Sequence, residues 1–180
     1  MARYVALLRG IAPSGRNMTN DKLRGVHERL GFDQVTSVLA SGNIVFRATE
    51  SDVPALEQRI EEALTRDLEL TSRVIVRSHA ELRALLDSDP FPGLTHGTDT
   101  YLTATFLKDA AAPPELPGRP DPLTQVVRYD EAARVVLAVT DTSTPGQTPT
   151  FMAWLETAYG KNITTRSWLT VQRIVRKLES

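Results

Sequence analysis

Short apolar segments flanked by charged or polar residues predict the strands in the first 77 positions of the chain. Two of these segments, residues 3–9 and 72–77, stand near the ends of this stretch. Between them, residues 35–40 and 43–47 are separated only by Ser41-Gly42, which predicts a tight hairpin.

The two intervals that remain between these predicted strands have apolar residues at helical spacing, which predicts a helix in each. Thr19 can cap a first helix, and Gly31 stands where a left-handed C-terminal cap is expected. Asp52 opens a second helix with Pro54 in its first turn. The resulting order, β-α-β-β-α-β, is that of a ferredoxin-like α-β plait.

Residues 78–180 show a similar mixture of helices and strands, without a convincing repeat at the residue level. Ser78 and Glu81 form a capping box that opens a helix, and Thr148 followed by Pro149 predicts the start of another. The other expected elements are a strand at 101–107, a proline-rich surface loop at 109–124, a hairpin of residues 125–129 and 134–139, and a final helix that begins near Thr164.

The final helix is expected to turn Trp168 inward and to carry a basic face formed by Arg166, Thr170, Arg173 and Lys177. Taken together, the patterns predict an α+β protein made of two ferredoxin-like α-β plait subdomains packed together. The first would span 1–77 and the second 78–180.

Positive charge is concentrated at the two ends of the chain, although the net charge is only −1. Residues 1–30 hold six Arg and Lys against two Asp and Glu, and residues 160–180 hold five against one. Such asymmetry indicates an anionic partner, or surface helices that merely differ in sign.

Composition excludes several classes of chemistry. The chain has no cysteine, which rules out disulfides, thiolate nucleophiles and cysteine-ligated metals. No apolar run approaches the roughly 20 residues needed to span a bilayer, so we expect no membrane partner. The N-terminus enters a strand pattern without the features of a signal peptide, which makes the cytoplasm the expected location.

A glycine-rich loop, Gly10 to Asn17, lies between the first predicted strand and helix. It resembles a phosphate-binding loop, but Arg16-Asn17 stands where Lys and Ser or Thr are needed, and Pro13 removes a backbone donor. Backbone N–H groups at the helix start, with Arg9 and Arg16 beside them, can still bind an anion. The structural alternative is a tight connection that requires glycine.

Two other polar segments stand at the ends of predicted elements. An arginine at position 166, in the first turn of a helix, opposes the helix dipole unless it pairs with an acid or helps to bind an anion. At the hairpin tip, Ser41-Gly42-Asn43 can present a hydroxyl and an amide to a ligand, or can simply satisfy the turn.

Patterns typical of metal, cofactor and RNA binding are missing from the sequence. His27, His79 and His96 are scattered, with no pair at helical spacing, so we expect no metal site and no cofactor. Tyr4 and Phe46 fall short of the aromatic cluster that an RNA-reading plait carries on its central strands.

Six motifs follow one another along the chain: Tyr4–Ile11, Gly15–Asn17, Leu30–Phe32, Ser41–Phe46, Asp89–Phe91 and Thr164–Val171. In this order they resemble an uncharacterised bacterial family, the domain of unknown function 1697, over essentially the whole chain. The resemblance implies a pair of α-β plait subdomains and carries no assigned activity. Several of the motifs are polar and lie at element ends, where binding sites tend to be found.

The chain departs from the family pattern at two places. The family typically has Ile-Asn-Val-Gly-Gly where this chain has Ile11-Ala12-Pro13-Ser14-Gly15, and Arg-Asn-Trp where it has Arg166-Ser167-Trp168. If the family's asparagines contact a ligand, this chain has altered or lost that chemistry.

These observations lead us to expect a cleft between the two subdomains that binds an anionic small molecule bearing a phosphate or a carboxylate. The expected ligand-binding residues are Arg9, Gly10, Gly15, Arg16, Asn17, Ser41, Asn43, Arg166, Ser167 and Trp168. A nucleic-acid-binding module and a structural or interaction protein without a ligand are the alternatives. The sequence indicates neither a catalytic residue nor an oligomeric state.

Overall fold

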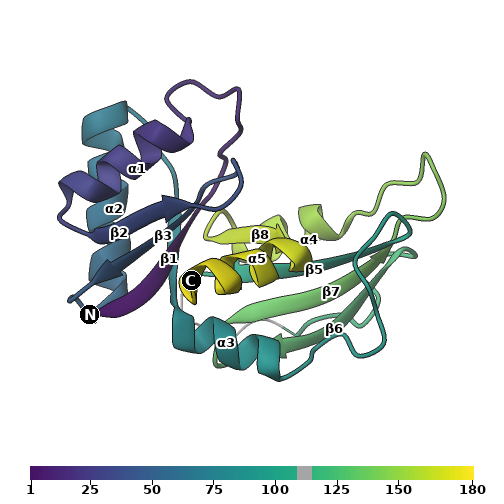
Figure 1. The fold of residues 1–180 in the computed structure, drawn as a ribbon. Coiled ribbons are helices and arrows are strands. Elements are labelled where there is room, and N and C mark those ends of the chain that lie inside the picture. Colours follow the sequence, from purple (N-terminus) through teal and green to yellow (C-terminus); the bar gives the residue numbers. More distant parts are fainter. Residues whose placement is uncertain (109–114) are drawn as a thin grey trace. The chain divides into compact units, whose positions relative to one another are not determined.

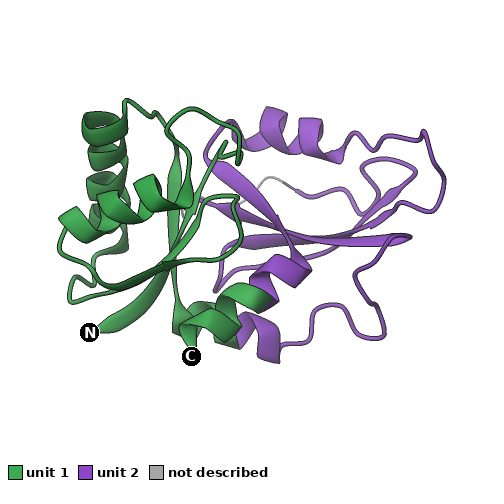
Figure 2. Ribbon diagram, turned by 45° about the horizontal axis from the view of Figure 1, so that its top comes forward, with its two compact units in different colours: residues 1–83, 173–180 green, residues 84–172 purple. Residues whose placement is uncertain are grey.

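A computed structural model describes residues 1–108 and 115–180 and divides the chain into two compact units. Unit 1 comprises Met1–Arg83 and Arg173–Ser180, and unit 2 comprises Ala84–Gln172 (Figure 2). The described residues form a mixed α/β structure with five helices and two four-stranded antiparallel sheets, one in each unit (Figure 1).

Unit 1 is built on a sheet with the strand order β2-β3-β1-β4. All neighbouring strands of this sheet are antiparallel. In chain order, its elements are β1 (Ala2–Leu8), α1 (Asn20–Arg29), β2 (Asp33–Ser37), β3 (Asn43–Ala48), α2 (Val53–Leu68) and β4 (Val74–Ser78).

The expected capping residues begin and end the helices of unit 1. The Thr19 side chain accepts a hydrogen bond from Lys22 N at the start of α1, and Gly31 follows this helix with a φ of 87°. Asp52 accepts from Ala55 N over 3.2 Å at the start of α2. These predictions are confirmed.

Alternate residues of β1 and β3 pack against α1 and α2 and form the core of unit 1. The central members of this core are Tyr4, Ala6, Leu8, Ile44 and Phe46 from the strands, and Leu23, Val26, Leu56, Ile60 and Leu64 from the helices. Side chains alternate between the faces of a strand, so Arg3 and Arg47 lie on the face that α1 and α2 leave uncovered.

Unit 2 contains a second sheet with the strand order β6-β7-β5-β8. Its strands and the helix on one of its faces are β5 (Thr100–Leu107), β6 (Thr124–Asp130), β7 (Val135–Asp141), α4 (Phe151–Tyr159) and β8 (Ile163–Ser167). Phe151 and Leu155 of α4 pack against Val136 and Ala138 of β7. The division between the units falls within α3 (His79–Asp87) and α5 (Trp168–Leu178).

The predicted helix start near Thr164 is wrong. Residues 163–167 form β8, where Thr165 and Arg166 pair with Thr105 and Ala104 of β5. The helix begins at Trp168, and the Ser167 hydroxyl accepts from Thr170 N over 3.2 Å. Arg166 is consequently buried in a strand and does not share an exposed basic face with Lys177.

Two other predicted boundaries also move. Helix α4 begins at Phe151 rather than at Pro149, because its cap comes from a distant carboxylate: Asp121 Oδ2 accepts from Thr150 N over 3.0 Å. Strand β2 ends at Ser37, so its connection to β3 is longer than the tight hairpin that we expected. The capping box of α3 is confirmed by its two reciprocal hydrogen bonds.

Part of the predicted proline-rich loop at 109–124, residues 109–114, lies outside the described residues. The described remainder up to position 123 contains no helix, and Asp121 forms only an isolated bridge with Thr124. None of the helices in the described ranges is both long and apolar enough to cross a membrane.

Candidate functional site

Two of the predicted segments, the Gly10–Asn17 loop and the Ser41–Asn43 hairpin tip, lie side by side in unit 1. Leu8 N donates to Gly42 O over 2.9 Å. Gly42 has a φ of 83°, and a Cβ added to it would lie 2.8 Å from Cγ1 of Ile11. Glycine is therefore required at position 42 both by the backbone conformation and by the close approach of the loop.

The two asparagines of these segments have partners within the protein. Asn43 is fully buried, and its Nδ2 donates to Val38 O and to Ser41 Oγ, both over 3.0 Å. Asn17 Nδ2 donates to Leu68 O over 2.8 Å. Both amides thus hold backbone segments in place, whereas the Arg16 side chain of the same loop is exposed.

The predicted residues Arg166, Ser167 and Trp168 belong to unit 2. Arg166 is 9% exposed, and burial lowers the pKa of its guanidinium to about 10. Its Nη1 donates to Thr164 Oγ1 over 2.6 Å and to Thr165 O over 3.0 Å. Trp168 packs edge-to-face against Phe91, with 5.2 Å between the ring centroids.

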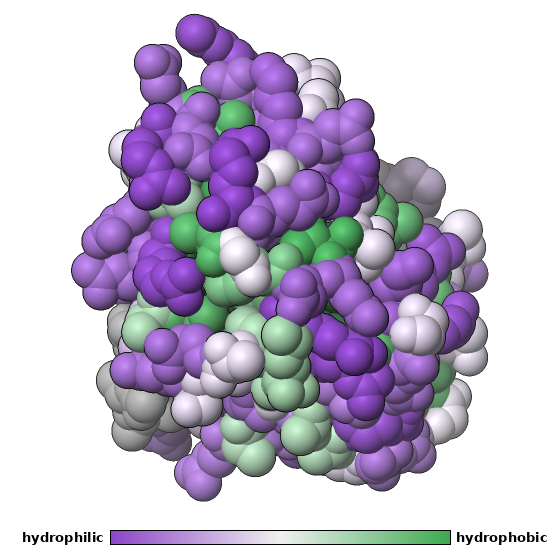
Figure 3. All heavy atoms as spheres, turned by 60° about the vertical axis from the view of Figure 1, so that its left-hand side comes forward, coloured by the Kyte–Doolittle hydropathy of each residue, from purple (hydrophilic) through white to green (hydrophobic). Residues whose placement is uncertain are grey.

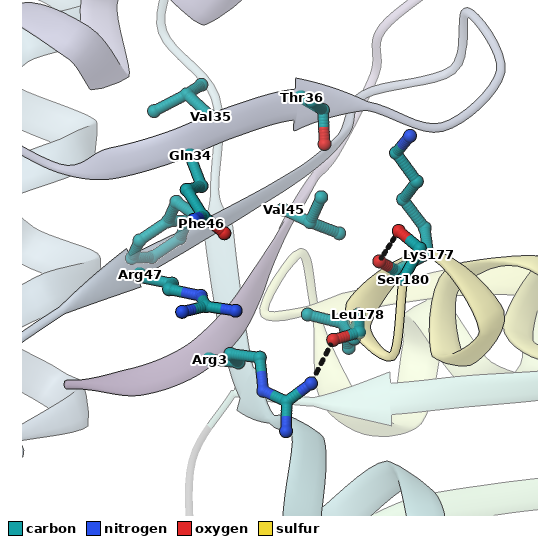
Figure 4. Close-up of a pocket in the computed structure, with 10 residues that line it drawn as sticks. All are labelled: Arg3, Gln34, Val35, Thr36, Val45, Phe46, Arg47, Lys177, Leu178 and Ser180. Atoms are coloured by element: carbon teal, nitrogen blue, oxygen red, sulfur yellow. Dashed lines mark hydrogen bonds between the residues drawn. The ribbon is translucent and has the colours of Figure 1, made fainter.

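A pocket of unit 1 is lined by three cationic side chains, none of which was among the expected ligand-binding residues, although Lys177 was assigned to the basic face of the final helix. These are Arg3, Arg47 and Lys177, around a cavity of about 330 Å³ (Figure 4). The other lining residues are Gln34, Val35, Thr36, Val45, Phe46, Leu178 and Ser180, so no aspartate or glutamate contributes to the lining. In Figure 4 the two guanidinium groups lie toward one side of the pocket and the Lys177 side chain toward the other.

Strand register places the two arginines of the pocket directly opposite each other. Arg3 of β1 pairs with Arg47 of β3 in the antiparallel ladder, and like charges in this position repel. Arg3 Nη1 donates to the backbone oxygen of Leu178 over 2.6 Å. Within the described residues, neither the Arg47 guanidinium nor the Lys177 ammonium forms a hydrogen bond or an ion pair.

Strand β2 supplies the neutral polar groups of the pocket through a bulge. The register between β2 and β3 shifts between Asp33 and Thr36, and Gln34 within this shift has a φ of 50°. Asp33 lies opposite Arg47 in the ladder, but it is exposed and does not contribute to the lining.

The charge of this pocket distinguishes it from two other cavities. A second cavity of unit 1 combines Glu61 and Glu62 with Arg66 and Arg73. A cavity of unit 2 combines aspartates 99 and 141 with an arginine at 119. Acidic side chains equal the arginines in number in the first of these cavities and outnumber them in the second, whereas the pocket around Arg3, Arg47 and Lys177 has no Asp or Glu side chain in its lining.

The surface in Figure 3 is mainly hydrophilic, and hydrophobic residues show only as a narrower area between polar side chains. Among residues 1–108 and 115–180, no group of three His, Cys, Asp or Glu side chains could hold a metal ion.

Sequence reasoning missed the pocket because its residues meet through the strand register of the unit 1 sheet and through the approach of the C-terminal end of α5 to it. Two signals pointed toward it. Arg3 and Lys177 belong to the two positively charged ends of the chain. Arg47 is spaced two and four residues from Val45 and Asn43, which places all three on the same face of the predicted strand.

The chain is similar in structure to a conserved bacterial protein, SP0830 from Streptococcus pneumoniae. The TM-score is 0.74 at 18% sequence identity, and the similarity covers 100% of this chain and 99% of the other. No curated protein matches the chain. The profile of the family described as protein of unknown function (DUF1697) matches residues 1–134, which confirms the resemblance for this part of the chain; the motif at Thr164–Val171 lies outside the matched residues. The chain belongs to the DUF1697 family.

Proposed function

We propose that this protein binds an anionic small molecule in the unit 1 pocket formed around Arg3, Arg47 and Lys177. One observation carries the proposal: two arginines face each other across neighbouring strands beside a lysine, and no Asp or Glu side chain contributes to the lining. An anion among these groups would replace repulsion by charge-assisted hydrogen bonds.

The shape of the pocket supports a small molecule over a nucleic acid. Single-stranded nucleic acids gain affinity when their bases stack on exposed aromatic rings. Phe46, the aromatic residue in the lining, is only 1% exposed and offers no such surface. The cavity of about 330 Å³ lies at the small end of the range for ligand pockets.

Anion binding stays a prediction for three other segments: the glycine-rich loop with Arg9 and Arg16, the Ser41–Asn43 tip and the Arg166–Trp168 segment. Of these, the loop is the alternative that is easiest to test, because the Arg16 side chain is exposed and can be changed without loss of buried contacts.

Calorimetric titration of the full chain with inorganic phosphate, sulfate and acetate tests the proposal. Arg47→Gln removes charge-assisted hydrogen bonds worth about 1.5 to 3 kcal/mol and is expected to weaken phosphate binding about tenfold or more. Lys177→Gln is expected to weaken it less, since this side chain is exposed. Arg176→Gln, at the neighbouring exposed position of α5, and Arg16→Gln are the controls and should retain binding.

Each proposal has its own contrary outcome. Loss of binding in Arg16→Gln, with full binding in Arg47→Gln, would transfer the anion site to the glycine-rich loop. Binding of oligonucleotides with an affinity that grows with length and falls steeply with salt would support the nucleic-acid alternative. No binding of any anion would support a structural or interaction protein.

The strand connections also support a proposal about fold type. In unit 1, a helical crossover joins β1 to β2 around β3, and another joins β3 to β4 around β1. This split β-α-β arrangement is characteristic of the ferredoxin-like plait, to which we propose to assign unit 1. The strand order of unit 2 follows the same scheme, with β5, β6, β7 and β8 in the places of β1, β2, β3 and β4.

A further inference from the structure

The basic pocket of unit 1 holds more positive charge than a single carboxylate can neutralise. We infer that the pocket selects a phosphate monoester, through the dianionic terminal phosphate, over a carboxylate. This inference rests on the proposed anion-binding function and specifies the class of anion.

The first argument for a phosphate monoester is the balance of charge around the pocket. Arg3, Arg47 and Lys177 contribute three positive charges, the C-terminal end of α5 subtracts about half a charge through its dipole, and the terminal carboxylate of Ser180 in the lining subtracts one more. The acidic side chains nearby reduce this excess little. Glu179, beside the lining residue Leu178, already accepts a hydrogen bond from Arg83 and is in contact with His79, and the exposed Asp33, although opposite Arg47 in the ladder, forms no ion pair with it. A phosphate monoester carries about −1.5 to −2 at neutral pH, which fits the remaining charge better than the −1 of a carboxylate.

The geometry of the arginine pair carries the second step. Residues directly opposite in an antiparallel ladder have Cα atoms about 4.5 to 5.5 Å apart, so the guanidinium groups of Arg3 and Arg47 start from adjacent positions. A carboxylate has two oxygens and is satisfied by one arginine fork. A terminal phosphate has three oxygens and can accept from both forks at once.

Neutral donors and pocket size carry the third step. The Gln34 amide and the Thr36 hydroxyl, both on the bulged strand β2, line the same pocket and can donate to an oxygen that the arginines leave free. The cavity of about 330 Å³ accommodates the phosphate and a small organic part, and is small for a dinucleotide.

Titration of the full chain with phenyl phosphate and benzoate tests the inference, because the two ligands share the same ring. Phenyl phosphate is expected to bind at least tenfold more tightly than benzoate at pH 7.5. Its affinity should fall several-fold at pH 5.5, where the phosphate, whose second pKa is about 6, loses its second charge. Sulfate remains a dianion at both pH values, so its binding should change little and serves as the control.

Arg47→Gln should reduce the preference for phenyl phosphate over benzoate to less than threefold, while Arg176→Gln should retain it. Thermal unfolding of both variants shows whether they remain folded, and Lys177→Gln provides a second pocket variant at an exposed position. Reduced preference in both pocket variants supports the inference.

The failures of the two proposals are distinguishable. Equal affinity for both ligands in the unchanged protein, weakened equally by Arg47→Gln, would retain an anion site and overturn the selection of phosphate. A preference that Arg47→Gln and Lys177→Gln leave intact would overturn it as well, because the selecting groups would lie elsewhere. Absence of binding by phenyl phosphate, benzoate and sulfate would overturn the anion-binding function itself.

Discussion

His27 makes the stability of unit 1 dependent on acid. The side chain is completely buried in α1, and its Nδ1 lies 2.8 Å from the backbone oxygen of Leu23. Nε2 has no hydrogen-bond partner within the described residues. The centroid of the imidazole ring lies 6.2 Å from the ring centroid of Phe32 and 5.8 Å from that of Phe46. The neutral ring therefore donates through Nδ1, and a second proton on Nε2 would place a charge among aromatic rings.

Burial lowers the pKa of His27 from 6.5 to about 4. In the unfolded chain the imidazole binds its proton near pH 6.5, so acid favours the unfolded state between these two values. The stability contribution is complete above pH 6.5 and is lost as the pH falls toward 4. This shift in pKa lowers the free energy of unfolding by about 3 kcal/mol in total, and by about 2 kcal/mol between neutral pH and pH 5.

Urea unfolding followed by circular dichroism at pH 7.5, 6.5, 5.5 and 5.0 measures this dependence. His27→Leu should flatten the curve between pH 6.5 and 5.0, because the group that takes up the proton on unfolding is gone. His79→Gln, which removes a half-buried histidine in contact with Glu179, is the control and should retain the acid dependence. Equal losses of stability in the unchanged protein and in His27→Leu would refute the reasoning, as would a titration by NMR that places the pKa of His27 near 6.5.

Two further substitutions test the local contacts of each unit by urea unfolding at neutral pH. Gly42→Ala should destabilise the protein by about 2 to 3 kcal/mol, because the new Cβ meets Ile11 in addition to the strain of a positive φ. Gly10 has a φ of 77° with open space around it, so Gly10→Ala should lower the free energy of unfolding by only about 1 kcal/mol. Equal losses of stability in Gly42→Ala and Gly10→Ala would contradict the close approach of the loop to Gly42. Asp121→Ala removes the carboxylate that accepts from Leu123 N, Thr124 Oγ1 and Thr150 N, and should cost about 2 to 3 kcal/mol; a change below 0.5 kcal/mol, within the range of ordinary surface substitutions, would contradict its role in starting α4.

Local signals were sufficient for most elements of unit 1. Caps at Thr19 and Asp52, the reciprocal pair Ser78 and Glu81, and apolar spacing between them predicted three helices that the structure contains. These signals work because a cap satisfies backbone groups through residues only a few positions away.

Prediction failed where a distant segment decides the local conformation. Thr164 and Ser167 are both suitable helix caps, and the choice between them depends on whether residues 163–167 pair with β5. Once they pair, the β-branched Thr164 and Thr165 fit a strand, and the cap moves to Ser167. Helix α4 shows the same dependence, since the carboxylate at its start comes from Asp121.

The candidate site depended even more on distant pairing. The excess of positive charge at both chain ends was consistent with an anionic partner or with surface helices that differ in charge, and the structure brings Arg3 and Lys177 from these ends to one pocket of unit 1. The third cation, Arg47, is determined by the register of β1 against β3, which no local pattern specifies.

The same kind of strand-to-helix connection occurs once in each unit, and it accounts for the burial of Arg166. Strand β4 ends in Arg77-Ser78 and β8 ends in Arg166-Ser167, each at the edge of its sheet. Each arginine donates through Nη1 to the carbonyl of the preceding residue over 3.0 Å, and the two are 0% and 9% exposed. Each serine hydroxyl then accepts from the backbone N–H three positions later, in Glu81 and Thr170.

No motif had drawn attention to Arg77, yet it makes the same hydrogen bond to the preceding carbonyl as Arg166 and is followed by the same serine cap. The formation of this connection is therefore a sufficient reason for an arginine at either position. Both guanidinium groups are more deeply buried than those of Arg3 and Arg47, which are only half-buried and line an open pocket. An arginine that already serves the connection has fewer N–H groups left for a ligand, whereas Arg47 keeps its whole fork available, and this difference favours the unit 1 pocket as the anion site.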